Sequence, residues 1–262
     1  MTPLAASARM YAVAPDAAAA WARFFTWLAA ASGVPLTLVE HAYPAPLADL
    51  WARPDLGATF MCGWPLSGEA PGRPILAAPV PAADWAAGRP IYRTDFVTRA
   101  DAPFVSLEDA LSGRLGFTAE TSWSGGIAPS RHLTSRGLAF RQRIGSLVTP
   151  RRAAEAVRDG TVDVAPLDSY AHELLRRYDP ALAGTLRVLE ATCAAPIPPL
   201  VASHSAPERA VRALRSTLLG GLPAEIAAPL GLVGFDAVGR KDYAAAMGEE
   251  GRPGLRPGPA GA

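Results

Sequence analysis

The chain has 262 residues, of which 50% are apolar and 19% charged, and its net charge is +1. This length suffices for one large domain or two lobes, and scattered basic residues argue against nucleic acid as a partner. Cys62 and Cys193 stand far apart without nearby histidine pairs, so they predict buried thiols and no metal or cofactor site. Neither a signal peptide nor a membrane span is visible, which predicts a cytoplasmic product, or a periplasmic one if the true start lies upstream.

Predicted strands and helices alternate through the first part of the chain. Strands are expected at residues 9–14, 36–40 and 58–62, and helices at 15–32 and 47–52. This βαβαβ order predicts a parallel sheet. Ligands bind at the carboxyl ends of parallel strands, so Tyr11 and Trp64 are candidates for the wall of a cleft, with core packing as the alternative.

A Pro- and Gly-rich passage at residues 71–90 separates this series from a second one. The second series has expected strands at 92–99, 114–118, 138–144 and 162–166, and a return strand at 186–191 leads to another Pro-rich passage. We therefore predict two α/β lobes joined by two crossovers. The first lobe comprises residues 1–88 and 191–236, the second comprises 89–190, and residues 237–262 are expected to form a flexible tail.

The stretch TAETSWSGGIAPS, residues 118–130, joins an expected strand to an expected helix. Ser122 and Ser124 offer hydroxyl groups, Gly125 and Gly126 allow close approach of the backbone, and the helix start carries a positive dipole end. These properties are typical of an anion-binding turn. A plain helix N-cap is the alternative.

Asp168 comes just after the expected strand at 162–166, and Tyr170 lies two residues further on. An aspartate in this position caps the next helix, or faces a ligand at the end of the sheet. The sequence leaves both roles open.

Four segments resemble the phosphate/phosphonate substrate-binding protein family. Ser122-Trp123-Ser124-Gly125 with Pro129 resembles its S-x-S-G-x-x-x-P signature. The segment DLGATFMCGWPLS resembles a motif of one branch, the run from Tyr92 to Gly125 resembles the start of its second lobe, and VDVAPLDSY resembles the strand whose final aspartate faces the ligand.

The resemblance implies a two-lobed type 2 periplasmic-binding-protein fold that holds a small oxyanion, phosphate- or phosphonate-like, between the lobes. It implies a monomer without enzymatic activity or cofactor, with an ABC-transporter permease as partner. The site residues expected on this basis are Tyr11, Trp64, Tyr92, Ser122, Trp123, Ser124, Gly125, Gly126, Asp168 and Tyr170. Two departures concern the ligand: Leu147 stands where the family commonly has histidine, and Trp123 replaces a hydroxyl residue and is expected to narrow the site.

Two other functions remain open from the sequence. Ser122-Trp123-Ser124-Gly125-Gly126 nearly matches the G-x-S-x-G elbow of serine hydrolases, with Asp168 and His204 in the required chain order. His172 is expected to be an exposed helical residue. A cytoplasmic ligand sensor derived from the binding-protein fold is the other alternative.

Overall fold

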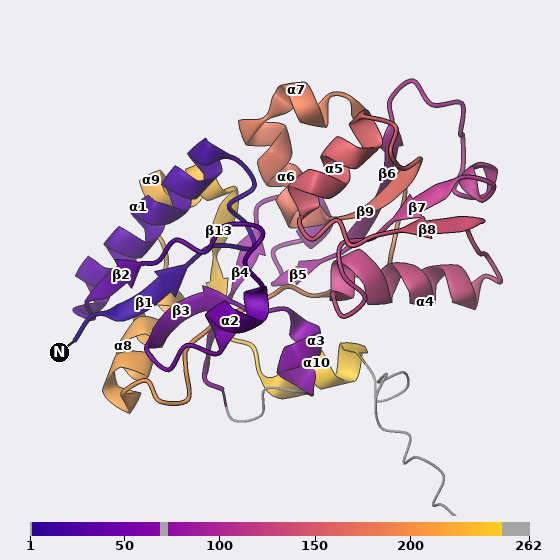
Figure 1. Ribbon diagram of the computed structural model, residues 1–262. Coiled ribbons are helices and arrows are strands. Elements are labelled where there is room, and N and C mark those ends of the chain that lie inside the picture. The colour runs from indigo at the N-terminus through magenta and orange to yellow at the C-terminus, as the bar shows by residue number, and fades with distance from the viewer. Residues whose placement is uncertain (1, 69–72, 248–262) are drawn as a thin grey trace, which may run out of the picture.

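The computed structural model describes residues 2–68 and 73–247. Its main strands form two separate sheets, one of six strands and one of five, which lie in two halves of the molecule (Figure 1). The chain passes between the halves at β5 (Ile91–Tyr92) and β11 (Ala195–Pro196), and these two short strands pair antiparallel. The interface between the halves is therefore spanned by two adjacent chain segments.

The first sheet has the strand order β13-β4-β12-β3-β1-β2. β1 runs parallel to β2 and β3, which confirms the parallel pairing predicted for this region. β12 runs antiparallel to β3 and β4, and β13 runs antiparallel to β4, so β4 keeps the direction of β3. The strands are β1 (Leu4–Ser7), β2 (Leu36–Leu38), β3 (Leu56–Phe60), β4 (Ile75–Pro81), β12 (Leu200–Val201) and β13 (Leu232–Asp236).

The prediction of a first strand at residues 9–14 is wrong, because the strand is β1 and residues 8–14 form a loop. All four β1 residues are buried between the neighbouring strands, where small side chains fit. The following loop begins with a tight turn in which the amides of Tyr11 and Ala12 donate to the carbonyl of Ala8. Arg9 and Tyr11 consequently lie beyond the carboxyl end of the strand.

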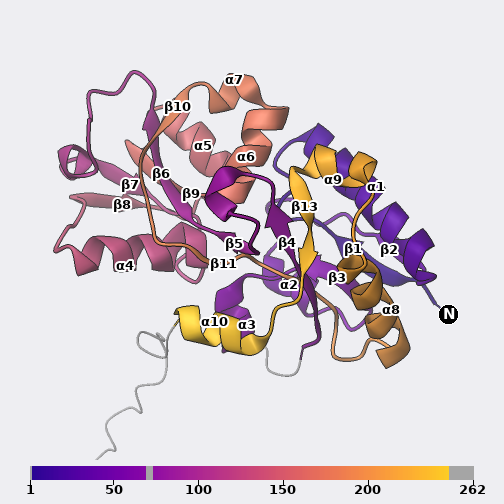
Figure 2. The same cartoon turned by 180° about the vertical axis from the view of Figure 1, so that it is seen from behind.

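Helix α1 (Pro15–Ser32) forms as predicted, with a proline in its first turn and Gly33 in the left-handed region at its end. Its inner face buries Trp21, Phe24 and Phe25, and it packs against α8 and α9 on one side of the first sheet (Figure 2). The other helices of this half are α2 (Leu47–Trp51), α3 (Gly63–Ser67), α8 (Glu208–Leu219), α9 (Ala224–Leu230) and α10 (Arg240–Met247).

The second sheet has the order β10-β6-β9-β7-β8, with β7 parallel to β8 and β9 and with β6 antiparallel to both its neighbours. Its strands are β6 (Thr94–Arg99), β7 (Arg114–Gly116), β8 (Gln142–Ile144), β9 (Val164–Asp168) and β10 (Leu186–Ala191). Its helices are α4 (Ala128–Ser135), α5 (Pro150–Arg158), α6 (Ser169–Tyr178) and α7 (Pro180–Ala183), and single 3₁₀ turns lie at η1 (Asp84–Ala86) and η2 (Glu108–Ala110).

The flexible tail expected from residue 237 is contradicted at α10, which packs against α3. Tyr243 and Met247 are fully buried one helical turn apart, and the Tyr243 hydroxyl donates to the carbonyl of Ile197 at 2.8 Å. Gly63 leaves the space they need, since a Cβ there would lie 2.2 Å from the Met247 Cε. Residues 248–262 lie outside the described part of the chain.

Candidate functional site

A small cavity of about 70 Å³ lies between the two halves. The first half lines it with Arg9, Met10, Tyr11 and Leu47, and the second with Thr118, Ser122, Ser124, Gly125, Val148, Thr149, Pro150, Pro166 and Asp168. This volume exceeds the space that one water molecule needs, and it is on the scale of a single tetrahedral oxyanion. Five of the expected site residues, Tyr11, Ser122, Ser124, Gly125 and Asp168, are thus brought together from three distant parts of the sequence.

The hydroxyl-rich wall is the turn that precedes α4. Residues Trp123–Ile127 form a short π-helical turn, η3, and Ser122 caps it by accepting a hydrogen bond from the Gly125 amide at 3.1 Å. The Thr94 hydroxyl holds the turn from the neighbouring strand by donating to the Ser124 carbonyl at 3.1 Å. Ser122 therefore acts as the cap that the simpler interpretation predicted, and it also lines the cavity.

The two glycines of this turn are explained by packing within the chain. A Cβ on Gly125 would lie 1.8 Å from the Thr118 Oγ1, and one on Gly126 would lie 2.3 Å from the carbonyl oxygen of Ala119. Real Cβ atoms do not approach other atoms so closely, so both positions require glycine. We expected these glycines to let the backbone approach a ligand closely, but the backbone here approaches residues 118 and 119 of the chain itself. Gly126 does not line the cavity.

Asp168 ends β9 and caps α6 in the way its position predicted. Its Oδ1 accepts hydrogen bonds from the amides of Tyr170 and Ala171 at 2.9 and 3.0 Å, and its Oδ2 accepts one from the Tyr11 hydroxyl at 3.3 Å. Burial raises the pKa of this carboxyl to about 7, against the opposing effect of these three donors. Near neutral pH the group exists in both protonation states, so it can donate to an oxyanion or accept from a protonated one.

Arg9 supplies the cation of the cavity, and the sequence analysis missed it. Its Nε is buried without a hydrogen-bond partner, and its guanidinium forms no ion pair with any residue that the structure describes. Burial lowers the pKa of Arg9. An unpaired, partly buried cation is costly unless an anion joins it. Arg9 could have been recognised as a charged residue just after a buried strand. Because the first strand was predicted at residues 9–14, Arg9 was assigned to the strand itself.

Tyr92 and Tyr170 are both fully buried but do not line the cavity. The Tyr170 hydroxyl donates to the carbonyl of Leu230 at 2.8 Å, and its ring packs edge-on against Tyr11. Burial raises the pKa of Tyr92 well above the ordinary tyrosine value, while the neighbouring Ser124 hydroxyl lowers it. Both tyrosines are therefore core residues, and Tyr170 contacts the Tyr11 ring that lines the cavity.

Trp64 and Trp123 contact each other across the interface between the halves. Their rings are stacked with centroids 6.4 Å apart, and the Arg131 guanidinium lies 5.7 and 5.2 Å from the two ring centres. The Trp123 amide also donates to the Cys62 Sγ at 3.4 Å. Neither indole lines the cavity, so Trp123 does not narrow it as expected.

The residues of a hydrolase triad do not meet at this site. His204 is exposed in the turn before α8, and no histidine is among the described residues that line the cavity. The expectation that His172 is exposed is wrong: it is buried, and its Nδ1 lies 3.0 Å from the Asp95 Oδ2. This pairing explains how a polar ring is accommodated in the core.

The sequence profile of ABC-transporter phosphonate periplasmic substrate-binding proteins matches residues 12–243, and the chain belongs to this family. A binding protein component of an ABC phosphonate transporter from Pseudomonas aeruginosa has a similar structure, with 21% identity, a TM-score of 0.76, and coverage of 90% of this chain and 82% of the other. No curated protein is similar enough to match.

Two further solved structures share the fold. PhnD1 from Prochlorococcus marinus in complex with methylphosphonate matches with 16% identity and a TM-score of 0.76, over 93% of this chain and 95% of its own. A histidine kinase sensor domain with similarity to periplasmic binding proteins matches with 15% identity and a TM-score of 0.57, over 89% and 97%. The fold is therefore that of the two-lobed type 2 periplasmic binding proteins, as the motifs predicted.

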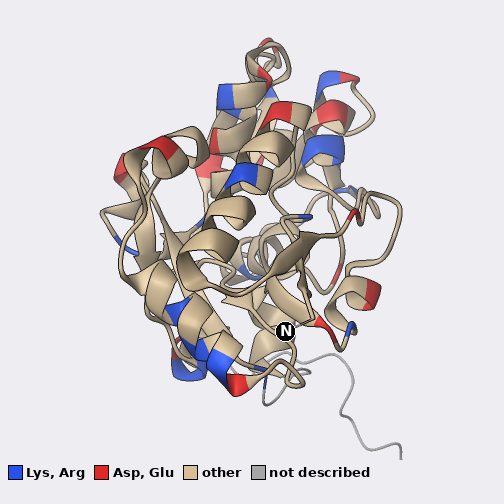
Figure 3. Ribbon diagram, turned by 90° about the vertical axis from the view of Figure 1, so that its left-hand side faces the viewer, with Lys and Arg blue, Asp and Glu red and all other residues tan. Residues whose placement is uncertain are grey.

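Short basic and acidic segments are scattered among uncharged ones in the view of Figure 3. Among residues 2–68 and 73–247, no helix combines the length and apolar character that crossing a bilayer requires.

Proposed function

We propose that this chain is the solute-binding component of a transporter and that it holds the oxyanion end of a phosphonate- or phosphate-like ligand in the cavity between its halves. The observation that carries the proposal is the unpaired Arg9 facing the same cavity as the hydroxyls of Ser122 and Ser124. Charge-assisted hydrogen bonds from such donors are the ordinary means of binding an oxyanion. The methylphosphonate-bound relative supports this ligand class.

Asp168 gives the cavity a way to adapt to the ligand's protonation state. A carboxylic acid at this position donates to a fully ionised oxyanion, and a carboxylate accepts from a protonated phosphoryl oxygen or from a ligand amine. Since the pKa of Asp168 is about 7, both forms are available near neutral pH. We therefore propose that binding of a dianion is accompanied by proton uptake.

Calorimetric titration with phosphate, phosphite, methylphosphonate and small carboxylates tests the proposal. Replacing both hydroxyls, Ser122→Ala with Ser124→Ala, is expected to cost about 2 to 4 kcal/mol of affinity, at roughly 1 to 2 per hydrogen bond to a charged group. Ser135→Ala with Ser216→Ala, at two exposed serines outside the cavity, serves as the control and should leave affinity unchanged.

Arg9→Gln tests the cation separately, with Arg23→Gln on the exposed side of α1 as its matched control. Only Arg9→Gln should weaken anion binding, and the weakening should diminish at high salt. Absence of anion binding by the wild type, or equal binding by the Ser122/Ser124 double variant, would refute the proposed function.

The protein's partners and location are part of the same proposal. The family works in the periplasm with a transporter, and we propose that this chain acts there as a monomer beside a permease. Fractionation of cells expressing the native gene, with light scattering of the purified protein, tests both statements. Recovery from the cytoplasm would favour the sensor alternative.

We propose that the protein is not an enzyme. No imidazole is placed to activate Ser124 in the cavity that the described residues form, so a fluorophosphonate probe should leave this serine unmodified. Labelling of Ser124 that is lost in Ser124→Ala would instead establish the hydrolase alternative.

A further inference from the structure

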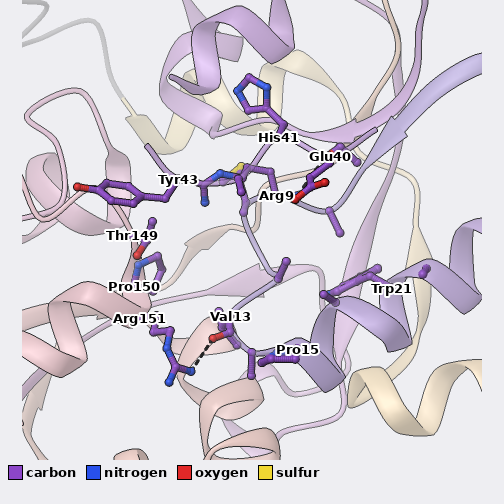
Figure 4. Close-up of a pocket in the computed structure, with 18 of the residues that line it drawn as sticks. Arg9, Val13, Pro15, Trp21, Glu40, His41, Tyr43, Thr149, Pro150 and Arg151 are labelled. Atoms are coloured by element: carbon purple, nitrogen blue, oxygen red, sulfur yellow. Dashed lines mark hydrogen bonds between the residues drawn. The ribbon is translucent and has the colours of Figure 1, made fainter. Parts of the chain in front are cut away.

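A larger cleft of about 740 Å³ is shown in Figure 4. It adjoins the small cavity, because Arg9, Met10, Thr149 and Pro150 line both. Its walls are the loop after β1, the first turns of α1, the segment after β2, and the start of α5. Small-molecule sites in proteins typically have volumes of about 300 to 1,000 Å³. The cleft is therefore large enough for an organic group that the small cavity cannot hold.

The cleft is lined mainly by apolar side chains. Pro15, Leu38, Val39 and Tyr43 expose apolar surface to it, whereas Trp21 and Phe25 also line it but are almost fully buried. Exposed Ala18 and half-buried Ala22 of α1 also line it, so the helix presents small side chains to the cleft and leaves it open. Such a surface favours an apolar, ring-sized group through burial and aromatic contact.

The polar groups of the cleft are mostly engaged with the chain itself. Arg151 donates to the Val13 carbonyl at 3.0 Å and pairs with Glu155 and Asp179. The Arg152 guanidinium lies 4.8 Å from the centre of the Tyr43 ring, and the His41 Nε2 lies 2.7 Å from the Pro46 carbonyl oxygen. Among the described arginines of the cleft, the one without a partner is Arg9, where the cleft meets the small cavity.

The charged side chains that line the cleft indicate which end of a ligand the cleft binds. Glu40 lines the cleft but not the small cavity. Glu155, Arg151 and Arg152 line the cleft as well. The charges beyond the junction therefore balance and favour an uncharged group there, whereas Arg9 favours an anion at the junction. The charge distribution thus matches a ligand with one anionic end and one uncharged end.

We propose that the ligand is an organic R–PO₃ compound, which is an organophosphonate or a phosphate monoester with an apolar, ring-sized group R. This inference rests on the proposed function. Its PO₃ group occupies the small cavity beside Ser122 and Ser124, and R occupies the larger cleft against Leu38 and Tyr43. Arg9 contacts the PO₃ group where the two spaces meet.

Calorimetric titration with two matched pairs tests this proposal: methylphosphonate against phenylphosphonate, and inorganic phosphate against phenyl phosphate. At least one phenyl compound should bind roughly tenfold or more tightly than its partner, since burying a ring-sized group contributes about 1.5 to 3 kcal/mol. Ala18→Phe places a ring in the cleft and should abolish this gain without changing the affinity for the small anions. Ala19→Phe, at the adjacent exposed alanine outside the cleft, should change neither.

Ala22→Leu, one turn along the same face of α1, provides a second filling variant, and thermal melting verifies that each variant is folded. If none of the four compounds binds, the proposed function itself fails. If a small anion binds but neither phenyl compound binds more tightly than its partner, the proposed function stands and this inference is refuted. Equal effects of Ala18→Phe and Ala19→Phe on the phenyl compounds would refute it too.

Discussion

The Tyr11 hydroxyl donates a hydrogen bond to the Asp168 Oδ2 at 3.3 Å, although 157 positions separate the two residues in the chain. Tyr11 lies in the loop after β1 in the first half, and Asp168 ends β9 in the second. The Tyr11 ring also packs edge-on against Phe60 and Tyr170, with centroids 4.8 Å away in both cases. The Tyr11–Asp168 hydrogen bond therefore links the two halves, and its acceptor is the carboxyl group that lines the cavity.

Tyr11→Phe keeps the ring contacts and removes this hydrogen bond. We expect it to lower the free energy of unfolding by about 1 kcal/mol, the typical net contribution of such a bond. A double-mutant cycle with Asp168→Asn, measured by chemical denaturation, should give a coupling of roughly 0.5 to 1.5 kcal/mol. Strictly additive effects would show that the two side chains do not interact in solution.

Stability should depend on pH through Asp168. Its folded pKa of about 7 lies above the ordinary value of 3.8, so the folded state binds more protons between these values. The contribution is therefore fully present below about pH 4 and is lost as pH rises to about 7, at up to roughly 1.4 kcal/mol per unit.

Asp168→Asn should remove this pH dependence while retaining the helix cap, because asparagine also accepts from N-terminal amides. Denaturation curves between pH 4 and 8 give the comparison, with Asp49→Asn in the exposed first turn of α2 as the control. A slope that persists in Asp168→Asn but disappears in the control would contradict the assignment.

Gly126→Ala should destabilise the protein by about 2 kcal/mol, because the new Cβ would meet the Ala119 carbonyl oxygen at 2.3 Å and backbone cannot easily yield. Gly234→Ala, in β13, is the matched control, since a Cβ there has open space and the residue's φ is not positive. Thermal melting of the two variants measures the difference. Similar melting temperatures would mean that the turn before α4 adjusts freely.

Trp123→Ala should separate the two halves as well as destabilise them. The variant loses the stacked contact with Trp64 and the cation contact with Arg131, at a cost of about 3 kcal/mol or more. Small-angle X-ray scattering should show a larger radius of gyration. Trp27→Ala, which removes an indole that contacts Phe24 within the first half, should lower stability without changing this radius. An increase in both variants would rule out a specific role for the Trp64–Trp123 contact.

Local chemistry made several features predictable from the sequence. The proline and Gly33 at the ends of α1, and the aromatic residues on one of its faces, determine where this helix lies and which side it buries. The caps at Ser122 and Asp168 use side chains within three residues of the amides they accept from. Such interactions are short in sequence, so their residue types and spacing suffice to identify them. The motifs around them likewise identified the family.

Contacts between distant segments could be found only in the folded structure. Residues 4–7 form a strand because β2 and β3 flank them, and α10 is held in place by its packing against α3. Packing likewise buries His172 beside Asp95 and directs Trp123 to Trp64.

The same distinction between local interactions and contacts of distant segments applies to the site. Spacing along the chain identified the hydroxyls and the aspartate, because each belongs to a local turn or cap. It could not reveal that Arg9 is unpaired and faces them, because a cation's partners depend on every segment that folds around it. The sequence alone thus determined the fold class and the local chemistry of each turn. The packing of the two halves decided which side chains share a cavity, since burial and charge pairing are properties of the whole folded chain.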